Sequence, residues 1–336
     1  LALVREESWL VWKLTGGLHI GDASNASRTQ LLALDGAGWD ADLCALFDIP
    51  PATLPVIVDN AGDFGATRPD LLGGPIPICG LAGDQQAATI GQGCLVPGQA
   101  KATLGTGAFI LAPVGDAPPR SDHRLLGTIL CQLDGRRRYA LEGSIFVAGS
   151  LVKWLRDALG LVGSAQETEA LARSVANNGG VSLLPALSGL GAPHWRPEAR
   201  GVIAGLTQGT TRAHIVRAAL ESIAHQAHDL AGAFAADGAP WTSLRLDGGM
   251  SANDWIAQDM ADMLDIAVER PADVETTARG AAMLAALGAG LHASIEAAAA
   301  RLPGRQRFAP AMDARVRADR LKTWGALLAA SERALP

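Results

Sequence analysis

Cys79-Gly80-Leu81-Ala82-Gly83-Asp84-Gln85-Gln86-Ala87-Ala88 is the segment around which the chain is organised. The apolar run Pro75-Ile76-Pro77-Ile78 precedes it, and this order predicts a buried strand, a tight turn and a helix that starts near Asp84. Asp84 would then lie at the mouth of a sheet, where open α/β folds bind their ligands. Taken alone, Asp84 is better explained as a helix cap that accepts backbone N–H bonds, so its role depends on the rest of the chain.

The composition is that of a well-buried protein with many turns. The chain has 336 residues, enough for two lobes, with 49% hydrophobic and 18% charged residues and 39 glycines. The net charge is −6 and no Lys/Arg stripe is interleaved with aromatics, which argues against nucleic acid as a partner. Arg136-Arg137-Arg138 is the one dense cationic run, and a solvated hairpin turn after Asp134-Gly135 explains it.

The cysteines and the apolar stretches indicate a cytoplasmic protein without a membrane partner. The four cysteines lie far apart and form no C-x-x-C pair, which suits a reducing compartment: Cys44, Cys79, Cys94 and Cys131. No apolar stretch has transmembrane length, and no signal peptide opens the chain. The first residue is Leu1 rather than Met, from which we expect the natural N-terminus to lie upstream. A homo-oligomer remains open as an alternative to a monomer.

Strands and helices alternate along the chain, which predicts an α/β protein. Helices are expected over residues 7–14, 39–47, 84–91, 145–159, 212–234, 253–264, 276–287 and 313–333. Strands are expected over residues 100–104, 108–112, 138–141, 181–185, 244–247 and 267–271. Gly93, Pro97 and Gly98 break the pattern and predict a hinge between a first domain, residues 1–93, and a second domain, residues 94–336.

Three glycine turns each follow a predicted strand: the turn before Asp84, Gly105-Thr106-Gly107, and Gly248-Gly249. Glycine has no Cβ, so backbone N–H groups in such turns can approach phosphate oxygens closely. Gly149 is expected inside the helix at 145–159, where glycine costs about 1 kcal/mol relative to alanine, so close packing or a ligand is expected there. The chain contains neither a Walker sequence nor G-x-G-x-x-G after a strand, so the turns only suggest phosphate binding.

Taken together, these segments resemble the FGGY carbohydrate kinases, and within that family the members that phosphorylate glycerol. The resemblance covers nearly the whole chain. It rests on residues 8–17, 25–29, 80–88, 105–107, 140–144, 154–157, 189–193, 199–201, 221–224 and 247–249 with Asn253. The Asp84-Gln85-Gln86 turn and the Gly189-Leu190-Gly191-Ala192-Pro193 loop favour glycerol as the substrate over other sugars.

The resemblance implies an actin-like (ribonuclease H-like) ATPase fold, with two lobes and an active site in the cleft between them. Asp84 matches the general base that accepts the proton of the substrate hydroxyl as it attacks the γ-phosphorus of ATP. Gln85 matches a residue that hydrogen-bonds the substrate, and Phe109 matches the aromatic that packs on its carbon backbone. ATP and Mg²⁺ are the implied cofactors. The positions that match the nucleotide-binding site are Gly105, Thr106, Gly107, Gly149, Gly248, Gly249 and Asn253.

The chain departs from the family pattern in three places. Its first lobe is incomplete, because the Asp-Gln-Gly-Thr-type phosphate loop that supports Mg²⁺, an Arg-Glu pair and a tyrosine have no counterpart, so this chain alone is expected to be inactive. Lys153 stands where the family usually has glutamine, and it either contacts a phosphate or faces solvent. Residues 73–75 lack the arginine that some members use for fructose 1,6-bisphosphate, so regulation by that sugar is not expected.

Other polar residues have a structural explanation beside a functional one. His225 and His228 are spaced to share a metal, but no third ligand is evident and a solvated or packing role explains them better, so no metal site is predicted. Glu142 either assists catalysis or caps the next helix, and Ser27-Arg28 forms a structural corner. His194-Trp195 either lines a pocket or plugs its loop.

The alternative functions are a kinase for another polyol or a ketose such as xylulose, and a non-catalytic truncated fragment.

Overall fold

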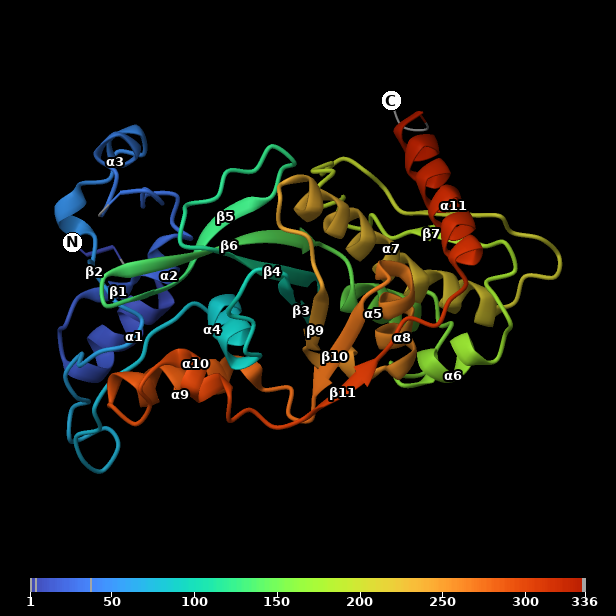
Figure 1. The fold of residues 1–336 in the computed structure, drawn as a ribbon. Coiled ribbons are helices and arrows are strands. Elements are labelled where there is room, and N and C mark those ends of the chain that lie inside the picture. Colours follow the sequence, from blue (N-terminus) through green and yellow to red (C-terminus); the bar gives the residue numbers. More distant parts are fainter. Residues whose placement is uncertain (1, 4, 37, 334–336) are drawn as a thin grey trace.

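The computed structural model describes residues 2–3, 5–36 and 38–333. Its centre is a seven-stranded mixed sheet with the strand order β11-β10-β9-β3-β4-β6-β5. Figure 1 shows the N-terminal part of the chain at one end of this sheet, and helices α5 to α8 and α11 at the other. The alternation of strands and helices confirms the predicted α/β class.

The sheet consists of β3 (Gln99–Leu104), β4 (Ala108–Gly115), β5 (Leu126–Leu133), β6 (Arg136–Ile145), β9 (Ser243–Asp247), β10 (Ala267–Pro271) and β11 (Arg305–Phe308). Two pairs of short strands lie outside it: β1 (Ile20–Asp22) with β2 (Val56–Val58), and β7 (Ser182–Leu184) with β8 (Val202–Ala204). The helices are α1 (Glu6–Thr15), α2 (Ala23–Ala26), α3 (Ala41–Leu46), α4 (Asp84–Gly91), α5 (Gly149–Asp157), α6 (Glu167–Arg173), α7 (Arg212–Ala236), α8 (Asp254–Leu264), α9 (Thr276–Gly288), α10 (Ile295–Ala299) and α11 (Ala314–Arg333), with 3-10 turns at Pro51–Thr53 and Gly249–Ala252.

The two faces of the sheet differ in chemistry. Strands β3, β9 and β10 run parallel, whereas β4, β5, β6 and β11 run antiparallel to their neighbours. Because side chains alternate along a strand, Ala100, Ala102 and Leu104 point to one face, where they join a large apolar core with α7 and α8. The opposite face carries two polar rows, which the register sets as Arg245–Lys101–Leu111–Glu142 and Asp247–Thr103–Phe109–Ser144. Helix α4 covers part of this polar face.

Helix α4 crosses α9 with backbone in contact with backbone. A Cβ on Gly280 would lie 1.8 Å from the Ala87 carbonyl oxygen, and a Cβ on Gly91 would lie 2.0 Å from that of Thr276. Only glycine permits this separation, so the two glycines set how deeply α4 lies against the C-terminal half of the chain.

The β5–β6 hairpin reaches from the sheet to the N-terminal part of the chain. Its turn at Asp134-Gly135 has positive φ at both residues, as a two-residue hairpin turn requires, and this confirms the predicted turn. The arginines that follow are less solvated than the sequence suggests. Arg137 donates to the carbonyls of Ala33, Leu34 and Gly36, and Arg138 pairs with Glu296.

Two local predictions are wrong. The apolar run before Asp84 forms no strand but only isolated bridges from Pro77 and Gly80, and Ile76 is 49% exposed. The two prolines remove the N–H groups that a buried strand needs, which explains the irregular path. Gly149 is the first residue of a helix and does not lie in its interior, because β6 continues to Ile145 and α5 begins only at Gly149.

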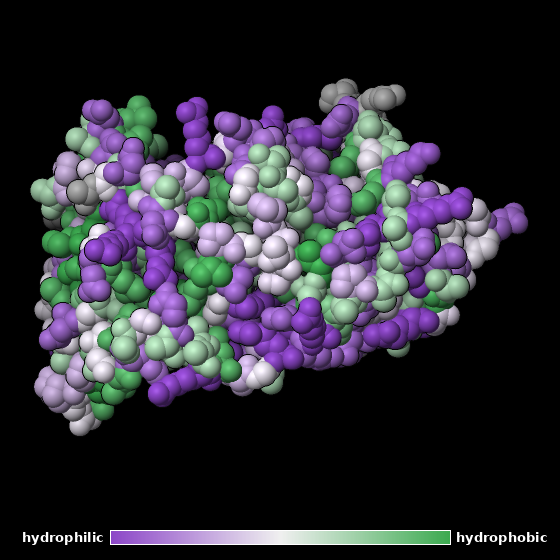
Figure 2. All heavy atoms as spheres, viewed as in Figure 1, coloured by the Kyte–Doolittle hydropathy of each residue, from purple (hydrophilic) through white to green (hydrophobic). Residues whose placement is uncertain are grey.

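Two surface properties complete the description. In the described part of the chain, no helix combines the length and the apolar character that a membrane crossing requires. Figure 2 shows hydrophobic side chains at the surface of the N-terminal part, where the exposed large residues include Trp9, Leu10, Trp12, Leu46, Phe47 and Val56.

The crossing of α4 and α9 gives a stability prediction. Gly280→Ala places a methyl group against the Ala87 carbonyl, and we expect the free energy of unfolding to fall by about 1–3 kcal/mol. Gly232→Ala is the matched control, because that helical glycine has open space around its Cβ position and alanine should stabilise α7 by up to about 1 kcal/mol. Urea unfolding of both variants measures the difference, and equal stabilities would contradict the close crossing.

Candidate active site

Asp84 is the first residue of α4, and its side chain is exposed. Gly83 occupies the N-cap position without a side-chain cap, so Asp84 is not the helix cap that its sequence context alone suggests. Its Oδ1 accepts the N–H of Gln85 at 2.8 Å, and its Oδ2 lies 3.3 Å from Nε2 of Gln85. The carboxylate is therefore held at a helix N-terminus, where the helix dipole favours negative charge, and it remains open to a ligand.

A buried network around Asp22 fixes the backbone just before Asp84. Asp22 is fully buried and accepts hydrogen bonds from Ser24, Asn25 and Asn60. Ser24 Oγ in turn accepts the Gly83 N–H at 3.0 Å, and Asn60 Nδ2 donates to the Leu81 carbonyl at 2.8 Å. The sequence analysis missed Asp22 and Asn60, since they lie 62 and 24 residues before Asp84 and only the fold brings them together.

Gln85 and Phe109 lie at the polar face of the sheet. Gln85 Oε1 accepts a hydrogen bond from Lys101 Nζ at 2.7 Å, and Lys101 is completely buried. Phe109 on β4 is 40% exposed and belongs to the same row as Thr103. Thr103, the register partner of Phe109, shares the Lys101 ammonium group with Gln85, so the sheet places the exposed ring in the neighbourhood of the carboxamide. An aromatic ring together with a carboxamide and a carboxylate offers the mixed surface that a small polyol requires.

Glu142 lies in β6 and does not cap a helix, so that alternative is wrong. Arg28 Nη2 donates to Glu142 Oε1 at 2.9 Å, whereas Oε2 has no partner among the described residues. Burial raises the pKa of Glu142, and Arg28 and Lys101 oppose that shift. The predicted corner at Ser27-Arg28 is present: Ser27 Oγ bonds Thr128 Oγ1 at 2.9 Å.

The turn Gly105-Thr106-Gly107 packs against the start of α5. Gly149 N donates to the Gly105 carbonyl at 2.9 Å, and Ser150 N donates to the Thr106 carbonyl at 3.0 Å. A Cβ on Gly149 would lie 2.5 Å from the Gly105 oxygen, which explains the glycine there. Thr106 itself is exposed, so its side chain is available to a ligand.

The second glycine turn lies beside the first. Strands β3 and β9 are parallel neighbours, and a Cβ on Gly248, at φ +82°, would lie 2.7 Å from the Leu104 oxygen. Gly249 is exposed at the start of the 3-10 turn. The two turns thus meet at the carboxyl ends of parallel strands, where α/β folds bind nucleotides, and these side-chain-free surfaces fit phosphate groups.

Asn253 has a clear structural role, whereas Lys153 is an exposed side chain. Asn253 caps α8, since its Oδ1 accepts the Ile256 N–H at 3.1 Å and its Nδ2 lies 3.3 Å from Thr168 Oγ1. Its side chain therefore already has partners. Lys153 is exposed on α5, one helical turn after Gly149, so it lies on the same side of the helix as the glycine.

The loop at 188–197 is held by side chains from other elements. His194 donates to Asp229 at 3.0 Å, and Trp195 Nε1 donates to the Arg124 carbonyl at 2.8 Å. The Trp195 ring packs edge-on against Phe146 with 6.0 Å between centroids. These contacts show that both residues secure the loop.

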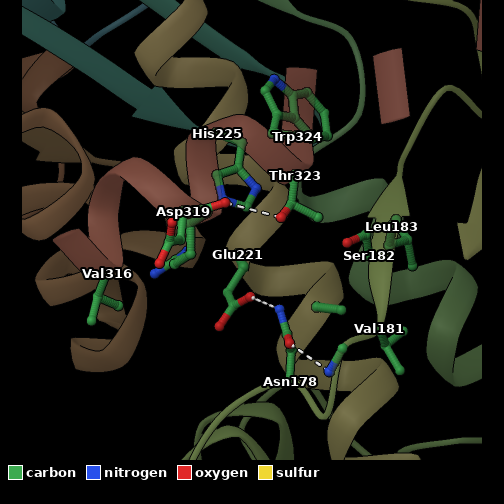
Figure 3. Close-up of a pocket in the computed structure, with 13 residues that line it drawn as sticks. Asn178, Val181, Ser182, Leu183, Glu221, His225, Val316, Asp319, Thr323 and Trp324 are labelled. Carbon is green, nitrogen blue, oxygen red and sulfur yellow. Dashed lines mark hydrogen bonds between the residues drawn. The ribbon is translucent and has the colours of Figure 1, made fainter. Parts of the chain in front are cut away.

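A separate cavity of about 240 Å³ lies between α7, α11 and the segment around β7 (Figure 3). His225 and Trp324 line this cavity, and their rings are stacked with centroids 5.2 Å apart. Nε2 of His225 is buried without a partner among the described residues, and burial lowers the pKa of this imidazole to about 3. The structural explanation for this histidine therefore holds. Within the described residues, no cluster of three or more His, Cys, Asp or Glu side chains could hold a metal ion.

Comparison with known families identifies the class of protein. The FGGY family of carbohydrate kinases matches twice: its N-terminal domain over residues 2–91 and its C-terminal domain over residues 100–289. The chain belongs to this family, and its fold is that of the FGGY kinases, as the sequence resemblance implies.

The relatives that it matches are named glycerol kinase. The chain is 51% identical over 325 residues to glycerol kinase of Rhodospirillum centenum, with 96% of this chain and 65% of that protein covered. Identity to glycerol kinase of Rhodospirillum rubrum is 56% over 296 residues, with 88% of this chain and 60% of that protein covered. The chain thus spans slightly less than two thirds of the length of these relatives.

Solved structures share the fold. Glycerol kinase of Plasmodium falciparum, determined with ADP, superposes with a TM-score of 0.90 at 36% identity, and the match covers 100% of this chain and 67% of that one. Xylulose kinase of Rhodospirillum rubrum superposes with a TM-score of 0.85 at 26% identity, covering 99% of this chain and 68% of that one.

The buried imidazole of His225 predicts a pH effect on stability. Its pKa is about 3 in the folded chain and about 6.5 when unfolded, so between these values the unfolded state binds the extra proton. The His225 imidazole therefore lowers the free energy of unfolding by about 1.4 kcal/mol for each pH unit as the pH drops below 6.5. His225→Phe keeps the ring against Trp324 and should remove this contribution. Urea unfolding at several pH values measures it; a difference between variant and wild type that is constant from pH 8 to pH 5 would contradict the prediction.

Proposed function

We propose that the protein transfers the γ-phosphoryl group of ATP to glycerol, giving glycerol 3-phosphate, with Asp84 as the general base. The observation that carries this proposal is the exposed Asp84 carboxylate at the start of α4. Hydrogen bonds from Gly83 to Ser24 and from Asn60 to Leu81 hold the backbone before it, and the Gln85 N–H donates to the carboxylate itself. Gln85 and Phe109 beside it supply a hydrogen-bonding group and an apolar surface. The names of the relatives support glycerol as the acceptor.

In this proposal Asp84, Gln85 and Phe109 form the substrate wall of the site, and each of them has one task. Asp84 accepts the proton of the attacking hydroxyl, which raises the nucleophilicity of that oxygen in the transition state. Gln85 binds a hydroxyl of the polyol, and the Phe109 ring contacts its carbon chain. Phosphoryl transfer depends mainly on positioning and on charge stabilisation, so fixed geometry at these residues is the main requirement.

The glycine turns form the proposed nucleotide wall. Gly105, Thr106 and Gly107 would hold the β- and γ-phosphates, and Gly149, Gly248, Gly249 and Asn253 would surround the rest of the nucleotide, with Lys153 near a phosphate. The fit rests on the close approach of the backbone at Gly149 and Gly248, where side chains are sterically excluded. Mg²⁺ bound with ATP would neutralise phosphate charge in this site.

Two other functions have specific support. Xylulose kinases share the fold, so a ketose is the second candidate substrate. A non-catalytic fragment is the candidate from a different class, since the chain spans 65% of the length of one relative and 60% of another.

Asp84→Asn tests the general base. In the full-length protein, the substitution keeps the size of the side chain and its hydrogen bond to the Gln85 N–H but removes the basic oxygen. We expect kcat for glycerol to fall by about 10²- to 10⁴-fold with little change in the melting temperature. A coupled ADP-release assay with glycerol, xylulose and other polyols measures both rate and substrate choice. An unchanged kcat would leave Asp84 without a catalytic role, and activity with another polyol alone would exclude glycerol.

Calorimetry with ATP on the 336-residue chain tests the nucleotide wall and the fragment alternative. We expect binding, and we expect Gly149→Val to weaken it at least about tenfold, because the side chain would displace the phosphate turn at Gly105. Gly209→Val is the control, since that exposed glycine has no backbone atom near its Cβ position. Absence of ATP binding by the unmodified chain would favour the fragment.

A further inference from the structure

Lys101 is a buried cation at the centre of the polar face of the sheet. Its side chain is 0% exposed, and it lies on β3 beneath the start of α4. Nζ donates to Gln85 Oε1 at 2.7 Å and to Thr103 Oγ1 at 2.9 Å. An ammonium group has three donors, so these two neutral partners leave one hydrogen for a further acceptor.

The ammonium group of Lys101 forms no ion pair within residues 2–3, 5–36 and 38–333. Among the described residues, no carboxylate oxygen lies within 4.0 Å of its Nζ. Burial lowers the pKa of Lys101, while Asp247, Glu142, the Cys94 thiol and Asp84 oppose that shift from a longer range. A buried ammonium without an ion pair is costly, and an apolar side chain of the same length would usually serve stability at least as well. Folding alone therefore does not explain a lysine here.

The hydrogen bond to Gln85 determines which way that carboxamide points. Carboxamide oxygen and nitrogen have the same shape, so packing alone sets no preference between the two orientations. An ammonium group can only donate, so it selects the orientation with Oε1 toward Lys101. Nε2 is then turned toward Asp84, where it lies 3.3 Å from Oδ2.

We propose that Lys101 is a positioning residue for the acceptor substrate, which acts by orienting the Gln85 carboxamide so that its NH₂ group faces Asp84 and the polyol. This inference rests on the proposed function and adds a residue to it. Lys101 also bonds Thr103, which lies two residues before the turn at Gly105, so a single ammonium group links the substrate wall to the strand that leads into the phosphate turn.

Lys101→Met in the full-length protein tests the inference, because methionine fills the space without the charge. We expect kcat/KM for the polyol to fall by about 10- to 100-fold, mainly through a higher KM for the polyol, while KM for ATP stays within about twofold. The melting temperature should be unchanged or higher, because an unpaired buried charge is lost. Lys322→Met makes the same substitution at an exposed position on α11 and should change none of these values.

A double-mutant cycle with Gln85→Ala separates positioning from a general structural effect. If Lys101 acts through Gln85, adding Lys101→Met to Gln85→Ala should raise KM for the polyol by less than about threefold. Additive effects in the double variant, or a KM for the polyol that Lys101→Met leaves unchanged, would overturn the inference.

Gln85→Glu provides a second route if Lys101→Met does not fold. Its carboxylate keeps a contact with the ammonium group, but the NH₂ donor that faces Asp84 is lost, so KM for the polyol should rise. A KM for the polyol that Gln85→Glu leaves unchanged would overturn the inference, because Lys101 is proposed to act through that NH₂ group. All variants are compared on the polyol that the wild type phosphorylates. The experiment can therefore contradict glycerol as the substrate without contradicting the role of Lys101, and the reverse.

Discussion

The backbone contact between α4 and α9 is the constraint on which the arrangement of the candidate site depends. Gly91 and Gly280 let the two helices approach to a distance that any side chain would prevent, and this fixes the axis of α4. Both ends of the helix are then secured by hydrogen bonds. Ser24 holds the Gly83 N–H before its start, and Arg245 and Arg305 each donate to the Gln92 carbonyl after its end at 2.8 Å. Asp84 is therefore presented on a rigid element.

The face of the sheet under α4 combines an apolar cluster, which includes Ile90, Leu111 and Leu284, with a set of buried polar groups. Gln86 donates to Thr128 at 3.0 Å, Gln92 donates to the Leu246 carbonyl at 3.0 Å, and Thr276 donates to Asp247. Buried polar groups without partners are costly, so each hydrogen bond in this layer restricts where its neighbours can lie. A layer of this kind contributes less to stability than an apolar one of the same size, but it defines one arrangement of the side chains at the cleft. Lys101 lies within this layer.

The sequence predicted local features of the site well and long-range ones poorly. A helix that begins at Asp84 and a hairpin around Gly105-Thr106-Gly107 follow from short patterns, and both are present. The helix start at Gly149 was misplaced because the apolar pattern of β6 runs on without a break signal. The sequence did not reveal the roles of Asp22, Asn60 and Lys101. Each role depends on partners that sheet register and helix crossing bring together, and short sequence patterns predict neither of these. The roles of all the site residues stay predictions: Asp84, Gln85, Gly105, Thr106, Gly107, Phe109, Gly149, Lys153, Gly248, Gly249 and Asn253.

The same contacts restrict where the molecule can bend. A hinge at Gly93 to Gly98 is attractive from the sequence, and both glycines have positive φ. The segment is tied at each end, however: the Gln92 carbonyl accepts two arginines, and the Gly98 carbonyl accepts the N–H and the hydroxyl of Thr242 at 2.7 and 2.9 Å. Motion there would break these bonds to β9 and β11. The chain on both sides of these glycines is therefore held to the strands of the sheet.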